Sequence, residues 1–148
     1  MVRRLCILCF LVALWPGLAL AQSAASMDAY NRYEALRAQG LYAEAEPFAV
    51  EALRLGEKEF GPAHPATATL VSNLAELYRA QGRYAQAEPL YKRSLAIWEK
   101  ALGPDHPDVG TSLENYAALL RQTGCSAEAT EMEARAKAIR AKYTLDNP

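Results

Sequence analysis

Two nearly identical five-residue segments constrain this sequence more than any other feature. Residues 61–65 read Gly-Pro-Ala-His-Pro, and residues 103–107, which begin 42 positions later, read Gly-Pro-Asp-His-Pro. Glycines at positions 40, 82 and 124 repeat the same interval. A fixed period of this length is typical of repeat architectures, in which each unit is one supersecondary element that stacks on its neighbours.

The same register extends through the whole unit. Residues 31–40 read Asn-Arg-Tyr-Glu-Ala-Leu-Arg-Ala-Gln-Gly, and residues 73–82 read Asn-Leu-Ala-Glu-Leu-Tyr-Arg-Ala-Gln-Gly, so that six of the ten aligned positions are identical. The segments Tyr-Ala-Glu-Ala-Glu-Pro at 42–47 and Tyr-Ala-Gln-Ala-Glu-Pro at 84–89 match in the same way. The sequence therefore indicates three units of one repeat.

Each unit is predicted to be a pair of helices. Glycine suits the position after a helix and proline the first helical position, so these residues mark the ends and the starts. Leu70, Leu74, Leu77 and Tyr78 recur at helical spacing on one face. The expected helices cover about residues 27–39, 43–60, 65–81, 85–102, 107–123 and 127–143. No strand pattern is visible, so we expect an all-α fold of three stacked antiparallel helical hairpins in a short right-handed superhelix, with repeats at about 27–60, 65–102 and 107–143.

The sixth predicted helix differs from the others. Met132, Ala136 and Ile139 keep an apolar stripe, while most of the remaining positions are charged. A polar last helix suits an end cap, whose outer face meets water instead of another repeat. Residues 144–148 are expected to be a frayed tail.

The first residues have the features of a secretory signal peptide. Arg3 and Arg4 supply positive charge, residues 5–15 form an apolar stretch too short to span a bilayer, and Ala19-Leu20-Ala21 is a small-x-small cleavage site. We expect a signal peptide at 1–21, a mature chain from Gln22 and a flexible leader at 22–26. The protein would then be exported to a periplasm or secreted, contacting the membrane only transiently; an uncleaved anchor is the alternative.

Charge and cysteine content exclude some classes of function. The formal net charge is −1, and it becomes −3 without Arg3 and Arg4, so nothing favours nucleic-acid binding. Only Cys125 remains after the predicted cleavage, and it cannot form an internal disulfide. We interpret it as a small apolar residue near a helix start, with an intermolecular disulfide as the alternative.

The motifs of the second unit resemble the tetratricopeptide repeat. Val71-x2-Leu74-Ala75-x2-Tyr78, followed by Ala87-x3-Tyr91, is similar to that pattern, with Val71 in place of the usual tryptophan. The 42-residue period and the Gly-Pro-x-His-Pro loops look more specifically like the kinesin-light-chain type of repeat. The end units depart from the pattern, because Tyr33 stands at a position for a small residue and Glu133 at a position for an aromatic residue.

The resemblance implies a binding surface on the first helix of each hairpin, because such stacks line their concave face with these helices. Members that bind peptides use asparagine and basic residues there. An amide row can bond an extended backbone, and an arginine row can take carboxylates in bidentate pairs. The predicted peptide-binding residues are Asn31, Arg37, Ser72, Asn73, Arg79, Asn115 and Arg121. We therefore expect a non-catalytic adaptor or scaffold of the cell envelope that binds an extended, acidic peptide segment of a partner protein.

Two alternatives stay open. In the first, the asparagines bond only neighbouring helices, and Arg37 and Arg79 pair with Glu34 and Glu76, three residues earlier. Arg121 lacks such a partner on its own helix, because Ala118 replaces the glutamate, and it is expected to be less paired. In the second, the protein is a structural subunit of a larger envelope assembly. Its contact residues at the open N-terminal end would be Tyr30, Tyr33 and Leu41.

Neither a metal site nor an active site is predicted. His64 and His106 are the only histidines, and two imidazoles fall short of the three or four protein ligands that zinc needs. We expect them to be helix-start residues of the repeated loop. No serine or cysteine has a histidine at a spacing that indicates a nucleophile and base, and no carboxylate pair has a recognisable setting. No cofactor is expected, and the oligomeric state is left open.

Overall fold

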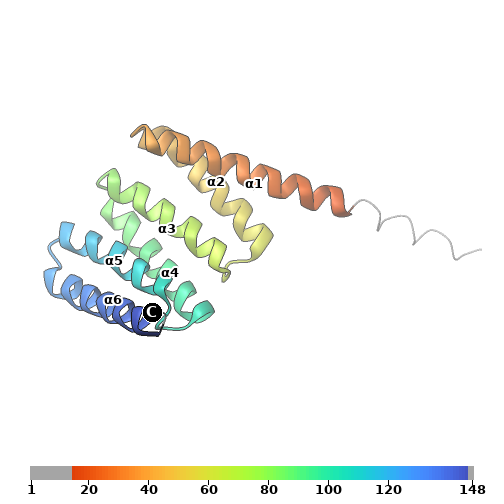
Figure 1. The fold of residues 1–148 in the computed structure, drawn as a ribbon. Coiled ribbons are helices and arrows are strands. Elements are labelled where there is room, and N and C mark those ends of the chain that lie inside the picture. The colour runs from red at the N-terminus through yellow and green to blue at the C-terminus, as the bar shows by residue number, and fades with distance from the viewer. Residues whose placement is uncertain (1–14, 147–148) are drawn as a thin grey trace, which may run out of the picture.

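The computed structural model describes residues 15–146, with side chains described from residue 24 to residue 145. This part of the chain contains helices and no strand (Figure 1). The helices are α1 (Trp15–Ala38), α2 (Tyr42–Phe60), α3 (Pro65–Ala80), α4 (Tyr84–Leu102), α5 (Pro107–Gln122) and α6 (Ser126–Asp146). No described helix combines the length and apolar character needed to cross a membrane.

The helices form three hairpins that stack in chain order. The pairs α1–α2, α3–α4 and α5–α6 make the most extensive contacts, and α2–α3 and α4–α5 join successive hairpins (Figure 1). The predicted all-α stack is therefore confirmed. Because each hairpin contacts only its neighbours, the molecule has no single central core, and the face formed by the first helices α1, α3 and α5 is shared by all three repeats.

Alanines let the two helices of each hairpin approach closely. Ala45, Ala87 and Ala129 occupy equivalent positions of α2, α4 and α6, and all three are fully buried. In the second and third repeats they face Ala75 and Ala117, also fully buried. Small side chains on both sides of the crossing leave the neighbouring leucines and tyrosines to fill the remaining space.

The repeated loops have one backbone design. Gly61 and Gly103 follow α2 and α4 with φ values of 93° and 89°, which only glycine adopts easily. His64 and His106 then cap α3 and α5, because Nδ1 of each ring accepts a hydrogen bond from the backbone N–H two residues later, at 3.1 and 3.2 Å. The predicted helix-start role of both histidines is confirmed.

The ends of the stack differ from the sequence prediction. Helices α2 to α5 lie within two residues of their expected bounds, but α1 begins at Trp15, so residues 22–26 are helical instead of a leader. That segment contains alanine, serine and glutamine and no helix breaker. Helix α6 continues to Asp146, supported by a hydrogen bond from Thr144 Oγ1 to the Arg140 carbonyl, so most of the expected frayed tail is helical. Residues 1–14 of the predicted signal peptide, and residues 147–148, lie outside the described residues.

Candidate functional site: a polar pocket between the second and third repeats

A hollow of about 220 Å³ lies between α3 and α5, and we call it the junction pocket. Polar side chains from the first helices of the second and third hairpins form most of its lining. The lining residues are Thr69, Ser72 and Asn73 on α3, Trp98 on α4, and Asp108, Thr111, Ser112 and Asn115 on α5. Three of the predicted peptide-binding residues, Ser72, Asn73 and Asn115, are thus brought together.

Two buried polar atoms of this lining have no hydrogen-bond partner. They are Asn73 Nδ2 and Ser112 Oγ, and the Ser112 residue is only 3% exposed. Burial and the Glu34 carboxylate raise the pKa of Tyr30, while the Asn73 amide opposes the rise, so this tyrosine lies near the amide without forming a hydrogen bond of normal geometry. Buried polar groups without partners are rare in folded proteins and cost free energy. Because both atoms are shielded from solvent, a ligand would reach them only if the lining side chains moved.

Two threonine hydroxyls of the pocket are already donors. Thr69 Oγ1 and Thr111 Oγ1 each donate a hydrogen bond to a backbone carbonyl four residues earlier, of Pro65 and Pro107 respectively, at 3.4 Å. A hydroxyl that donates its single proton keeps its lone pairs, so both oxygens can still accept hydrogen bonds from a ligand.

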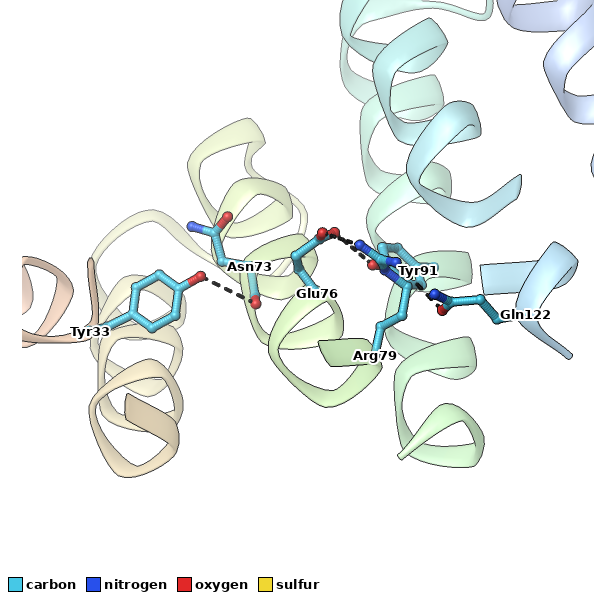
Figure 2. Close-up of polar contacts among 6 residues, drawn as sticks. All are labelled: Tyr33, Asn73, Glu76, Arg79, Tyr91 and Gln122. Atoms are coloured by element: carbon cyan, nitrogen blue, oxygen red, sulfur yellow. Dashed lines mark hydrogen bonds and ion pairs between the residues drawn. The ribbon is translucent and has the colours of Figure 1, made fainter. Parts of the chain in front are cut away.

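The predicted asparagine row is only partly realised as one site. Asn31 is exposed on α1 and does not line the junction pocket, whereas Asn73 and Asn115 do. The backbone carbonyl of Asn73 accepts a hydrogen bond of 3.4 Å from the Tyr33 hydroxyl, which links the first repeat to the second (Figure 2). The asparagine side chains on α3 and α5 are therefore the pair positioned to contact one ligand.

The arginine row is held by carboxylates of the protein itself. Arg37 bonds Glu34 at 2.7 Å, and Arg79 bonds Glu76 at 2.5 Å, as one alternative predicted. The expectation that Arg121 is less paired was wrong. Its Nε and one terminal nitrogen bond both oxygens of Glu133 on α6, at 2.7 and 2.6 Å.

The partner of Arg121 had a signal in the sequence. Glu133 stands 42 residues after Tyr91, so the third repeat has a glutamate on its second helix where the second repeat has a tyrosine. The third repeat also has Ala118 on its first helix where the second repeat has Glu76. The carboxylate has moved from the first helix to the second, and the ion pair is kept. This bidentate contact lowers the pKa of Glu133, because the hydrogen bond from Arg121 favours its charged form.

In the second repeat the corresponding groups form a cluster. Tyr91 is fully buried and donates a hydrogen bond of 2.8 Å to Glu76, whose other oxygen accepts from Arg79 (Figure 2). Burial, followed by the Glu76 carboxylate, raises the pKa of Tyr91, so its hydroxyl stays a donor. Arg79 also contacts Gln122 on α5 at 3.4 Å. The cluster joins α3, α4 and α5, and it commits Arg79 to the structure.

Sequence reasoning missed Trp98, Asp108 and Ser112. The sequence did contain a signal for Trp98 and Ser112, because both differ in size from the residues at the aligned positions of the preceding repeat. At the first junction, the residues 42 positions earlier are Gly56 and Leu70, and a Cβ atom placed on Gly56 would lie 2.3 Å from Leu70 Cδ1. The large side chain therefore belongs to α3 at the first junction and to α4, as Trp98, at the second.

The predicted end-contact surface was wrong at Tyr33. This side chain is 2% exposed and packs in the cluster that joins the first two repeats, so it cannot bind a partner at an open end. The reason is its register, because it occupies the position that Ala75 and Ala117 hold in the other units. Tyr30 is half-buried, and Leu41 is 40% exposed.

The described residues contain no group of three or more histidine, cysteine or acidic side chains arranged to hold a metal ion. Cys125 is a free, exposed thiol in the turn before α6, which is more accessible than the expected apolar helix-start residue. The side chains that line the junction pocket can form hydrogen bonds, and Asp108 adds one carboxylate.

Comparisons with known proteins agree with the stacked helical fold. A family model for the tetratricopeptide repeat matches residues 23–93 and again residues 68–142. The fold is similar to the crystal structure of BtubC (BKLC) from P. vanneervenii, with a TM-score of 0.74 and 25% identity over 80% of this chain and 48% of that one.

A second similar structure is from Podosopora anserina and is described as a kinesin light chain with nearly identical TPR-like repeats. Its TM-score is 0.68, with 24% identity over 84% of this chain and 57% of that one, which shows a shared fold. The present chain thus spans about half the length of these solved relatives. No curated protein matches the sequence.

Proposed function

Because the chain belongs to the tetratricopeptide repeat family, whose repeats generally mediate contacts between proteins, we propose that it holds an extended segment of a partner protein in the groove between α3 and α5. Ser72, Asn73 and Asn115 would bond the backbone of that segment. The role is that of a non-catalytic adaptor or scaffold.

The observation that carries this proposal is the polar lining of the junction pocket, to which Ser72 and Asn73 contribute from α3. Amide and hydroxyl groups can donate to the carbonyls of an extended peptide and accept from its N–H groups. Asn115 adds a second amide from the facing helix. Amides can pair with any backbone, so this recognition would orient a partner segment through its main chain.

Charge gives weaker support to the acidic peptide that the sequence predicted. An acidic partner would have to displace Glu34, Glu76 and Glu133, because these carboxylates already hold the three arginines. We therefore assign recognition to the amides and hydroxyls of the junction pocket and leave Arg37, Arg79 and Arg121 as structural contacts outside its lining.

A crosslinking pull-down from the native cell fractions tests the groove. The bait is the purified protein, compared with an Asn73→Ala/Asn115→Ala double variant and with Gln86→Ala, which removes an exposed amide of α4 outside the pocket. We expect a partner that the wild type and Gln86→Ala capture and that the double variant loses. Equal capture by all three proteins would contradict the proposal.

Export to the cell envelope is part of the proposal and rests on residues 1–21 of the sequence. N-terminal sequencing of the protein recovered from a periplasmic or culture-medium fraction tests it. A mature chain that begins at Gln22 is the expected result. An intact chain found only in the cytoplasmic fraction would contradict export without affecting the groove.

The second candidate is end-on assembly into a larger structure. It is favoured by exposed large apolar side chains in the first repeat, where Met27 is 59%, Leu41 40% and Val50 45% exposed. A Leu41→Glu variant that loses a captured partner, while the Asn73→Ala/Asn115→Ala variant keeps it, would favour this function. The opposite pattern would favour the groove.

A further inference from the structure

The residues that line the junction pocket differ from those at the aligned positions of the first junction, so the pocket is specific to the second junction. At the first junction the positions 42 residues earlier hold larger or apolar groups, among them Tyr30 for Ser72, Leu70 for Ser112 and Ala66 for Asp108. Asn73 and Thr69 are retained there as the counterparts of Asn115 and Thr111. The features specific to the second junction are thus a carboxylate, an indole and extra hydroxyl groups, which points to recognition of one particular side chain.

Most of the free hydrogen-bonding capacity in the pocket is acceptor capacity. The hydroxyls of Thr69 and Thr111 donate their protons in hydrogen bonds to backbone carbonyls, and their oxygen lone pairs remain available as acceptors. The hydroxyl oxygen of Ser72 and the amide oxygens of Asn73 and Asn115 are acceptors as well. A ligand side chain with several N–H donors would fit this set better than a carboxylate would.

Asp108 supplies the only charge among the eight lining residues. Its side chain is 52% exposed, and its nearest basic neighbour is His106 Nδ1, 3.5 Å from Oδ2. That nitrogen also accepts the hydrogen bond from the Asp108 backbone N–H at 3.2 Å. Asp108 also lies in the first turn of α5, where the helix N-terminus favours a negative charge.

Neighbouring acidic groups are neutralised, in contrast to Asp108. Asp105, in the loop before α5, bonds Lys142 at 2.6 Å, and Glu114, on the next turn of α5, bonds Arg140. The charge that this region presents to the pocket is therefore negative and comes from one residue. A positively charged side chain is the complementary ligand.

Trp98 adds an aromatic wall. It is half-buried against the apolar cluster of Val109 and Leu113 while lining the pocket. A guanidinium or ammonium group near an indole gains attraction from the ring electrons. The volume of about 220 Å³ is below the roughly 300–1,000 Å³ of small-molecule sites, so it suits one side chain better than a cofactor.

We infer that the junction pocket binds one basic side chain of the partner segment, arginine in preference to lysine, with Asp108 as its counter-ion. Arginine is preferred because its five N–H donors lie in a fixed plane that can meet several acceptors and pack on an indole together. The inference rests on the proposed function, since the basic side chain belongs to the segment that the groove holds.

A random dodecapeptide phage library is the probe. Phage that bind the purified wild-type protein are selected, and those that also bind the Asn73→Ala/Asn115→Ala variant are removed. The surviving peptides are synthesised with a fluorescein label, and their Kd values are measured by fluorescence anisotropy. We expect them to share one arginine, and its replacement by lysine to weaken binding less than its replacement by glutamine.

The protein variant Asp108→Asn then tests the counter-ion. It should raise the Kd of the arginine peptide about 2- to 5-fold, the range expected for a partly exposed ion pair. It should leave the Kd of the glutamine version unchanged. Asp105→Asn is the matched control, because it removes the same charge from the loop just before α5, outside the junction pocket, and it should change neither Kd.

The outcomes separate the two proposals. Surviving peptides without a basic residue, or an Asp108→Asn effect that is equal for the arginine and glutamine peptides, would overturn the inference and leave the groove function standing. A library from which no peptide distinguishes wild type from the Asn73→Ala/Asn115→Ala variant would overturn both.

Discussion

Replacing Tyr33 with alanine should uncouple the first hairpin from the stack. The side chain is 2% exposed and packs between α1, α2 and α3, where its hydroxyl donates to the Asn73 carbonyl at 3.4 Å. Truncating a buried aromatic residue to alanine costs about 3–5 kcal/mol, and a long hydrogen bond adds about 0.5 kcal/mol. Against a total stability of roughly 5–15 kcal/mol, this loss is large enough to release one repeat.

The position of the loss matters as much as its size. In a linear stack, the stability is approximately a sum of repeat terms and junction terms, so damage at the first junction should stay local. Hydrogen exchange measured by mass spectrometry should show that the amides of α1 and α2 lose about 3–5 kcal/mol of protection. The amides of α5 and α6 should keep theirs.

Tyr33→Phe is the control for this experiment. It keeps the ring and removes only the hydroxyl, so its protection should stay within about 1 kcal/mol of the wild type throughout. A uniform loss of protection along the whole chain of Tyr33→Ala would refute the assumption of independent junctions. Unchanged protection in α1 and α2 would refute the burial of Tyr33 between the repeats.

Three further predictions concern the loops, the ion pairs and the junctions. Gly103→Ala should destabilise the fold by about 1–3 kcal/mol in urea melts, because its φ of 89° and ψ of 159° suit glycine alone. The hydrogen bond from Arg83 lowers the pKa of Glu46, so this pair stabilises the fold above the ordinary glutamate pKa, and its contribution is lost as the pH falls through the lowered value. Glu46→Gln should therefore reduce the dependence of the urea midpoint on pH in this acidic window. Gly56→Trp should destabilise by about 1–3 kcal/mol through overpacking, and adding Leu70→Ser should recover part of that loss.

Each of these has a result that would count against it. A Gly103→Ala protein as stable as the wild type would mean that the loop can relax to a negative φ. Parallel pH curves for wild type and Glu46→Gln would mean that the contact with Arg83 adds nothing to folding. Strictly additive effects of Gly56→Trp and Leu70→Ser would mean that the two sites do not share one space.

The bounds of α2 to α5 were predictable because glycine and proline residues mark where these helices end and begin. Gly61, Pro65 and their equivalents at 103 and 107 mark where α2 and α4 end and where α3 and α5 begin, so local chemistry alone gives these bounds. Such marks are missing from residues 22–26 and after Tyr143. There, the continuation of a helix depends on residues that tolerate helix without requiring it, and the sequence prediction began α1 too late and ended α6 too early.

The site was only half predictable for a different reason. The register correctly placed Ser72, Asn73 and Asn115 on one face, since a repeat fixes which positions share a surface. Register alone does not show which side chain from the second helix reaches that face. The hydrogen bond from Arg121 to Glu133 and the position of Trp98 both depend on contacts between helices, so neither follows from the spacing within α3 or α5.

The exchange of Gly56 and Leu70 for Trp98 and Ser112 also fixes the order of the units. A gene duplication that inserted a second copy of residues 65–106 directly after the first would place Trp98 of one copy beside Leu70 of the next, with two large side chains where each present junction has one. The joints between these repeats are therefore not interchangeable. A duplication would add a stable repeat only if substitutions at the new junction also removed one of the two large side chains, even though the repeats are similar in sequence.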